Sequence, residues 1–305
     1  MPELPDIEAY RAALAERVEG RALMRACVIS PFFLRTFEPP IEALLDRRVS
    51  AVERLGKRIV LTFEAPKPAY GQQEMLLAFH LMIAGRFRWS DARSRPPGKI
   101  SLASFEFESG VLHVVEPGQK KRAALHVLSG RDALRGLDRG GIDVLTATSS
   151  AFRAAIMRGN HTLKRALSDP STLDGIGNAY ADEILHAARL SPVKLSSRLS
   201  TDEIGRLHDA ARATLRHWID ELCRRFARKF PGPGDITAFR PEFAVHGKYG
   251  RPCPVCGTSV QRIRYAENET NYCPRCQTGD RVLADRSLSR LLRGDWPRTV
   301  EELER

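Results

Sequence analysis

The chain has 305 residues, 43% of them hydrophobic and 28% charged, which is enough for two modest domains with a core of normal size. No apolar run approaches the ~18 residues that a membrane helix needs, which excludes helical membrane spans. The net charge of +11 and the pI of about 9.7 favour a polyanionic partner, nucleic acid first and an acidic membrane surface second.

The chain begins Met-Pro-Glu-Leu-Pro-Asp-Ile-Glu, without the basic start and apolar run of a signal peptide, and we therefore expect a cytoplasmic protein. A small residue such as Pro2 normally permits removal of the initiator Met. The chain would then start with a secondary amine, and the carboxylate of Glu3 would lie beside it. An α-amine is neutral at pH 7 far more often than a lysine, so it suits imine formation at a sugar carbon, with Glu3 transferring protons.

A helix is predicted directly after this start. An apolar stripe at spacings of three and four is formed by Ile7, Tyr10, Leu14 and Val18. Gly20 follows as a stop signal. Such a helix would bury one face and hold the amine in place. The alternative interpretation is that Pro2 and Pro5 only stiffen the entry into this helix.

Residues 1–135 are predicted to form a β-sandwich behind the leading helix, because short alternating apolar runs recur from residue 21 between Pro- and Gly-rich turns. Lys57 follows Gly56 at a strand entry and is placed to reach into a cleft. Lys120, Lys121 and Arg122 follow a Pro-Gly turn and indicate an exposed basic loop. For both basic sites the alternative is a solvated surface charge. Ile83 lies in an apolar stretch, 80–86, which indicates core followed by a turn.

The period becomes helical after a loop-like linker over 136–150, and residues 151–240 are predicted to form a helical domain. Within it, Gly175 and Gly177 flank an isoleucine just before Asn178, which we expect to be the N-cap of the next helix. The two glycines permit close approach of a phosphate, and the free N–H groups at the helix start suit its binding. The alternative is a tight turn between helices with no ligand.

Residues 241–280 are predicted to form a zinc finger. Two Cys-x2-Cys pairs separated by 16 residues supply four thiolates at tetrahedral zinc spacing, namely Cys253, Cys256, Cys273 and Cys276. Four protein ligands close the coordination sphere, so the predicted cofactor is one structural Zn²⁺. Cys27 and Cys223 are expected to be buried core thiols. Residues 281–305 are predicted to form a helical extension that packs on the body.

Taken together, four motifs in order resemble the formamidopyrimidine-DNA glycosylase and endonuclease VIII family of base-excision repair enzymes. They are Pro-Glu-Leu-Pro over 2–5, Leu-Gly-Lys over 55–57, Gly-Ile-Gly-Asn-Ala-Tyr-Ala-Asp-Glu over 175–183, and the four-cysteine finger. The stretch from Phe243 to Cys253 also resembles the lead into that family's finger. The resemblance implies an α+β multidomain fold: a β-sandwich with a leading helix, a helix–two-turn–helix domain and a zinc finger.

The resemblance also implies the chemistry. Pro2 would attack C1′ of a flipped, damaged nucleotide, and Glu3 would donate and accept the protons. Lys57 would contact the flanking phosphate and assist β-elimination, and Asn178 with the turn before it would grip the DNA backbone. The expected partner is double-stranded DNA with a damaged base or an abasic site, bound by a monomer.

Three positions depart from the family pattern. Asn268 stands where the family's finger hairpin has an arginine, between Glu267 and Glu269, so the resemblance leaves open both the grip of the finger on DNA and δ-elimination. Ile83 stands where the family usually has a methionine that fills the gap left by the flipped base. The loop with Lys120, Lys121 and Arg122 lacks the Arg-Phe pair of members that act on oxidised guanine. It could still bind phosphate.

Two other functions stay open at this stage. The first is a protein on the same scaffold that binds DNA lesions or DNA structures without excising a base. It is favoured by the altered finger tip and wedge and opposed by the set of Pro2, Glu3 and Lys57. The second is a zinc-ribbon transcription or RNA factor, which requires the N-terminal motif to be a coincidence. The sequence leaves open which damaged base is excised.

Overall fold

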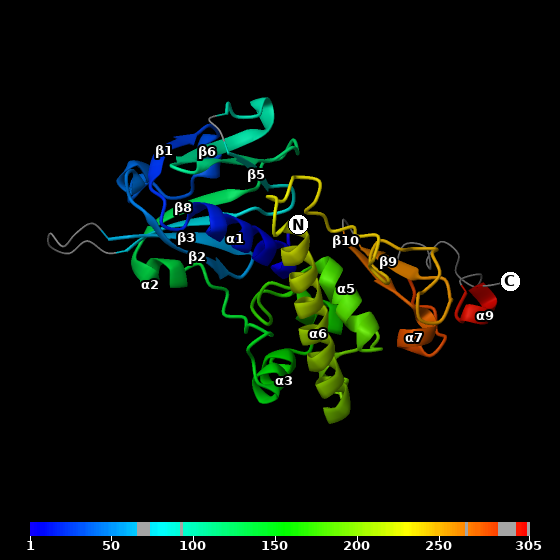
Figure 1. Cartoon of the computed structure of the whole chain (residues 1–305). Coiled ribbons are helices and arrows are strands. Elements are labelled where there is room, and N and C mark those ends of the chain that lie inside the picture. The colour runs from blue at the N-terminus through cyan, green and yellow to red at the C-terminus, as the bar shows by residue number, and fades with distance from the viewer. Residues whose placement is uncertain (66–73, 92–93, 266–267, 286–296, 304–305) are drawn as a thin grey trace. The chain divides into compact units, whose positions relative to one another are not determined.

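The computed structural model describes residues 1–65, 74–91, 94–265, 268–285 and 297–303 (Figure 1). The chain divides into two compact units. Unit 1 combines Met1–Asp138 with Trp218–Thr237, and unit 2 combines Arg139–His217 with Ala238–Arg305. The predicted boundaries at 135, 150, 240 and 280 stay predictions. Within the described part of the chain, none of the helices has the length and apolar character that crossing a bilayer requires.

Unit 1 is a β-sandwich with a leading helix, as predicted. Helix α1 (Leu4–Val18) precedes eight antiparallel strands: β1 (Leu23–Val28), β2 (Val49–Leu55), β3 (Arg58–Phe63), β4 (Met75–His80), β5 (Arg86–Ser90), β6 (Ser101–Phe107), β7 (Gly110–Val115) and β8 (Ala124–Ser129). The strands form two four-stranded sheets in the orders β1-β6-β7-β5 and β2-β3-β4-β8. One hydrophobic core receives the inward faces of both sheets and the buried stripe of α1.

The outer face of the second sheet is also buried. Ile59, Leu61 and Phe63 of β3 point into the shared core, as the alternation predicts. Val60, between them, packs in a second cluster with Leu134 of the short helix α2 (Gly130–Arg135). Helix α2 therefore covers a face that simple alternation assigns to solvent.

A distant segment completes unit 1. Phe230 lies 5.7 Å from the ring of Tyr10, and the guanidinium of Arg17 lies 5.5 Å above the Phe230 ring. Ile236 is buried in the shared core. The residues after the long helix α6 (Thr201–Phe226) are thus packed against α1, about 220 positions away in the sequence.

Unit 2 is helical before the finger, as predicted. Its helices are α3 (Ser149–Met157), α4 (Leu163–Ser168), α5 (Asn178–Ala187) and the first part of α6. A capping box opens α6, because the Ser200 backbone donates to Glu203 Oε2 at 2.9 Å and the Glu203 backbone donates to Ser200 Oγ at 3.2 Å.

The finger is a hairpin followed by a short helix. Strands β9 (Gln261–Tyr265) and β10 (Asn268–Tyr272) pair antiparallel, and α7 (Pro274–Thr278) follows. In the extension, residues 282–285 are not helical and α9 spans Val300–Leu303. Of the helical extension predicted over 281–305, residues 286–296 and 304–305 lie outside the described residues.

Candidate functional site

The chain start is buried in unit 1. Pro2 is buried and Glu3 is only 3% exposed, directly before the first turn of α1. The Glu3 backbone N–H donates to Asp6 Oδ2 at 2.9 Å, which fixes the entry into the helix. All four residues of the predicted stripe, Ile7, Tyr10, Leu14 and Val18, are 0–1% exposed. A helix with so much buried surface holds the first residues in one place.

The pKa of the Met1 α-amine shows how the surroundings of the chain start act on a terminal amine. Burial lowers its pKa below the usual 8.0, because desolvation penalises the ammonium form. The charge of Glu3 raises this pKa, whereas the charges of Arg86 and Lys57 lower it. Three side chains from separate parts of unit 1 thus act on the same amine. A terminal amine at this place is shifted towards its neutral, nucleophilic form.

Lys57 lies at the tip of the hairpin between β2 and β3. Leu55 pairs with Arg58, so Gly56 and Lys57 form a two-residue turn, and Gly56 has a φ of +61° that favours glycine. Arg54 donates to the Gly56 carbonyl at 3.2 Å and to Glu8 Oε1 at 2.8 Å. This half-buried ion pair ties the Lys57 turn to α1, and hence to Glu3.

His80, at the end of β4, adjoins the same basic turn. It pairs with Arg58 across the sheet. Its pKa is lowered to about 4, first by burial and then by the charges of Arg58 and Lys57. The sequence of this stretch indicates only core followed by a turn, and it carries no signal for His80.

We expect His80 to make the protein less stable in mild acid. Its pKa is about 4 in the folded chain and about 6.5 in an unfolded chain, so between these values the unfolded state binds more protons. Stability is full above pH 6.5 and falls as the pH drops, by about 2 kcal/mol at pH 5 from this group. In urea titrations at pH 7 and pH 5, His80→Asn should lose that part of the fall. The control is His217→Asn, on the exposed side of α6, which should show the wild-type dependence of stability on pH. If His80→Asn loses as much stability between pH 7 and pH 5 as the wild-type chain does, His80 is not the group responsible.

The loop between β4 and β5 presents Ile83. Its side chain is 51% exposed. Gly85 is required in this loop, because an added Cβ would lie 2.3 Å from the Leu81 carbonyl oxygen. Arg86 donates to the carbonyls of Gly85 at 2.7 Å, Ile83 at 3.2 Å and Ile236 at 2.8 Å. One guanidinium therefore organises the loop and anchors the distant segment, a role that no sequence signal indicated.

The basic loop after β7 lies next to this one. A Cβ added at Gly118 would be 3.8 Å from the Ala84 side chain. The loop is built on Glu116, which is 1% exposed and accepts from the backbone N–H groups of Arg122 at 2.9 Å and Ala123 at 3.1 Å. Lys120, Lys121 and Arg122 are exposed, and Lys121 also donates to the Glu116 carbonyl.

In unit 2 the glycine turn leads into α5. Gly175 has a φ of +83°, whereas Gly177 is extended and is itself the N-cap. The prediction that Asn178 caps the helix is wrong, because Asn178 is the first helical residue. Its Nδ2 instead donates to the Glu269 carbonyl of β10 at 2.9 Å. The asparagine that was expected to touch DNA therefore also joins α5 to the finger.

Two buried carboxylates of α5 strengthen this connection. Asp182, 0% exposed, contacts Lys164 Nζ at 2.6 Å, His246 Nδ1 at 2.7 Å and the backbone N–H of Asn271 at 3.1 Å. Glu183 accepts from the backbone N–H groups of residues 244–246 at 2.8–2.9 Å. Burial is the largest influence on the Glu183 carboxyl and raises its pKa. Both residues belong to the 175–183 motif, but their partners are far away in the sequence.

The finger tip is less acidic than its sequence suggests. Asn268 is exposed at the start of β10, and Glu267 lies outside the described residues. Glu269 Oε2 lies 3.3 Å from Arg262 and 3.9 Å from Arg264, both on β9. These two arginines, for which the sequence carries no local signal, outweigh the negative charge of Glu269.

The four predicted zinc ligands converge. The Sγ atoms of Cys253, Cys256, Cys273 and Cys276 all lie within 4.8 Å of one another. The pair 253–276 is 3.9 Å apart and the pair 256–273 is 3.4 Å apart, near the ~3.8 Å expected for tetrahedral Zn–S bonds of ~2.3 Å. His186 Nε2 lies 3.3 Å from the Cys253 Sγ and supplies a hydrogen-bond partner outside the ligand set. This donor set fits one structural zinc ion.

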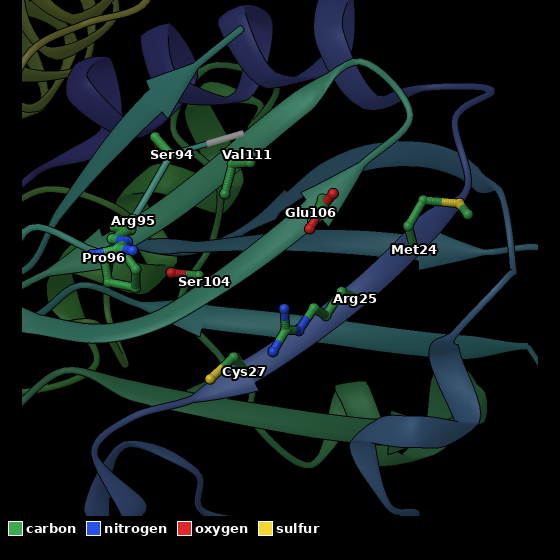
Figure 2. A pocket seen from close by; sticks show the side chains of 9 residues that line it. All are labelled: Met24, Arg25, Cys27, Ser94, Arg95, Pro96, Ser104, Glu106 and Val111. Atoms are coloured by element: carbon green, nitrogen blue, oxygen red, sulfur yellow. The ribbon is translucent and has the colours of Figure 1, made fainter. Parts of the chain in front are cut away.

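A separate cavity of about 550 Å³ lies on the outer face of the β1-β6-β7-β5 sheet. Figure 2 shows Arg25 and Cys27 of β1 beside Ser104 and Glu106 of β6. Cys27 is exposed, contrary to the prediction of burial, because it occupies the outward position of an edge strand; Cys223 is half-buried. Among the described residues, the cavity lining includes none of the predicted site residues.

Three family models match the chain in order. The formamidopyrimidine-DNA glycosylase N-terminal domain matches residues 1–121, the H2TH domain of the same enzymes matches 143–224, and a zinc finger found in FPG and IleRS matches 250–279.

Individual proteins agree with these matches. The chain is 33% identical to the formamidopyrimidine-DNA glycosylase of Thermomicrobium roseum and 31% identical to that of Heliobacterium modesticaldum, over 91% of this chain and 99–100% of the relatives. Among solved structures, the MutM (Fpg) protein from Thermus thermophilus superposes with a TM-score of 0.74 at 28% identity, covering 90% of this chain and 98% of the other. A mutant of the Lactococcus lactis FPG protein, in complex with a Fapy-dG containing DNA, gives a TM-score of 0.78 at 25% identity, covering 91% and 100%.

Proposed function

Since the chain belongs to the formamidopyrimidine-DNA glycosylase family, we propose that it is a DNA glycosylase of base excision repair that also cleaves the strand at abasic sites. The observation that carries this proposal is the buried chain start, where Glu3 lies beside Pro2 and the charge of Lys57 acts on the terminal amine. The substrate is double-stranded DNA that contains a damaged base or an abasic site.

The first step is base release at C1′. After removal of Met1, the Pro2 nitrogen uses its lone pair to form a bond to C1′ and then releases its N–H proton, and the base leaves with the electron pair of the glycosidic bond and takes up that proton. Glu3 donates a proton to the ring oxygen as the C1′–O4′ bond opens, which leaves an iminium ion. The nucleotide has to be flipped out first, since the stack shields C1′.

The second step is β-elimination. Loss of a proton from C2′ of the iminium ion expels the 3′-phosphate and breaks the strand. Lys57, held near the chain start by the Arg54–Glu8 ion pair, contacts the flanking phosphate and neutralises its charge. In unit 2, Asn178 and the turn with Gly175 and Gly177 bind the backbone near the lesion. Ile83, exposed at its loop tip, fills the gap left by the flipped base. Lys120, Lys121 and Arg122 contact phosphates nearby.

Borohydride trapping tests the proposal, because borohydride reduces an imine to a stable amine and so links protein and DNA covalently. We expect a cross-linked band when the chain that starts at Pro2 is mixed with an abasic duplex and borohydride. If such a chain binds the duplex but forms no cross-link, Pro2 forms no imine, and a protein that binds DNA without excising bases is the better account.

We expect Glu3→Gln to separate the two steps. Gln cannot transfer a proton, and general acid–base catalysis contributes on the order of 100-fold or more, so base release from a lesion duplex should fall by about that factor. Trapping on a preformed abasic site should fall much less, because its C1′ is already an aldehyde and no base has to leave. A gel assay with both duplexes measures this difference, and Asp6→Asn is the control for the neighbouring carboxylate. Wild-type excision by Glu3→Gln would remove Glu3 from the mechanism.

A further inference from the structure

One face of the finger hairpin is turned towards α5. Cross-strand partners point to the same side of a sheet, so the pairs Arg262–Asn271 and Arg264–Glu269 share one face. Asn271 is buried, and its backbone and side chain contact Asp182 of α5. The two arginines therefore stand on the same side of the hairpin as α5.

The two arginines differ in how they are held. The guanidinium of Arg262 lies 4.2 Å above the Tyr249 ring and 3.3 Å from Glu269 Oε2. The Arg264 side chain is 62% exposed and lies 3.9 Å from the same oxygen. The Glu269 carboxylate is thus shared by two arginines, which leaves one net positive charge on this group of three side chains. Of the two arginines, Arg264 is the one that extends into solvent.

The start of α5 lies beside this charge. Asn178, the first residue of α5, donates through Nδ2 to the Glu269 carbonyl at 2.9 Å. Glu269 is the cross-strand partner of Arg264. Glu269 therefore contacts the first residue of α5 through its backbone carbonyl and Arg264 through its carboxylate.

The C-terminal extension holds the backbone of Arg264. Asp285, 2% exposed, accepts from the Arg264 backbone N–H through Oδ2 at 2.6 Å. Leu283 donates to the Tyr272 hydroxyl at 2.7 Å. Further along, Val282 and Arg298 are joined by a backbone hydrogen bond of 2.9 Å, and Val300 is buried. All these residues of the extension follow position 279, where the zinc-finger match ends.

We propose that Arg264 binds a backbone phosphate of the DNA, and that Asp285 is a positioning residue that fixes the part of β9 from which Arg264 projects. This contact supplies the finger with a charge that Asn268, at the tip, lacks. It also gives the C-terminal extension a role in DNA binding. The proposal rests on the proposed function, since the phosphate belongs to the lesion-bearing duplex.

The test is the salt dependence of binding to an abasic duplex, measured by fluorescence anisotropy with the zinc-loaded full chain. For Arg264→Ala we expect about 10-fold weaker binding, and a slope of log K against log salt that is smaller by about 0.9, the value for one phosphate contact. Arg264→Lys should keep the slope. The control is Arg275→Ala. Arg275 is an exposed arginine of α7 in the same finger and is paired with Asp280, so its removal should change neither the affinity nor the slope.

Suppose that the wild-type chain binds the duplex and is trapped on it, but that Arg264→Ala changes neither the affinity nor the slope. This result overturns the role of Arg264 and leaves the proposed function intact. Failure of the wild-type chain to be trapped overturns the proposed function instead. The two outcomes are therefore distinguishable in one set of samples.

A double-mutant cycle tests Asp285. Asp285→Ala should weaken binding, whereas Asp285→Asn, which keeps an acceptor for the Arg264 N–H, should restore most of it. In the Arg264→Ala background, Asp285→Ala should have no further effect on affinity or slope. An equal loss in both backgrounds would show that Asp285 only stabilises the fold, and would overturn the positioning role.

Discussion

A chain that retains Met1 should form at least ~100-fold less borohydride-trapped adduct with an abasic duplex than a chain that starts at Pro2. With Met1 present, the Pro2 nitrogen is a tertiary amide whose lone pair is delocalised, so it cannot attack a carbon. The Met1 amine is displaced by one residue, up to ~3.6 Å, and a misplacement of even 1 Å can cost about 100-fold. The two forms are separated by mass spectrometry after expression with and without inhibition of methionine removal.

Peptide mapping of the adduct provides the control. The cross-link should lie on Pro2 in the wild-type chain, and Lys57→Ala should still form it, although with weaker strand cleavage. Pro2→Gly keeps an α-amine at nearly the same place, so it should be trapped to a reduced but measurable extent. An adduct of equal yield in the Met1 form, mapped to Lys57, would make Lys57 the nucleophile and contradict the role of Pro2.

Loss of the zinc ion should unfold the finger and abolish most DNA affinity while unit 1 stays folded. The finger's own buried cluster contains Val245 and Val260 with Cys253 and Cys273, which is too small a core to fold without the metal. Structural zinc supplies roughly 10–16 kcal/mol in comparable fingers. For Cys253→Ser we expect zinc content to fall from one per chain towards zero and affinity for an abasic duplex to fall at least ~10-fold, measured by metal analysis and anisotropy.

The matched control is Cys27→Ser, which changes an exposed cysteine of unit 1 and should affect neither zinc content nor affinity. The circular dichroism of the β-sandwich should also stay the same in Cys253→Ser, because its core cluster, over the residues that the structure describes, contains none from the finger. Full affinity of a zinc-free chain would argue against a role of the finger in binding DNA.

Local patterns were sufficient for much of the architecture. The stripe from Ile7 to Val18 predicted α1, because each of its residues lies three or four positions from the next on one helix face. The spacing of the two cysteine pairs predicted the metal ligands, since tetrahedral thiolate sites need few residues between ligands. In each case the interacting groups are close in sequence, or their chemistry permits few other partners.

The capping role of Asn178 failed for a physical reason. An asparagine before a helix often caps it, but at this position the helix includes Asn178 and the tertiary fold offers the Glu269 carbonyl, 91 residues away, as a partner for its amide. The prediction that Cys27 is buried is wrong for a similar reason, because its exposure depends on which strand lies at the edge of the sheet. Neither the partner of Asn178 nor the edge position of the strand that carries Cys27 can be read from the adjacent residues.

The sequence by itself therefore determined the β-sandwich with its leading helix, the helical unit and the four zinc ligands, because these follow from periodicity and short spacings. Only the tertiary structure decided which buried or half-buried charges hold the candidate site in place: Glu8 with Arg54 behind the Lys57 turn, Asp182 between α5 and the finger, and Asp285 on the backbone of Arg264. An Asp or Glu in the sequence does not by itself show whether its carboxylate is exposed or holds a buried partner. Its role depends on burial and on partners that folding brings from distant parts of the chain.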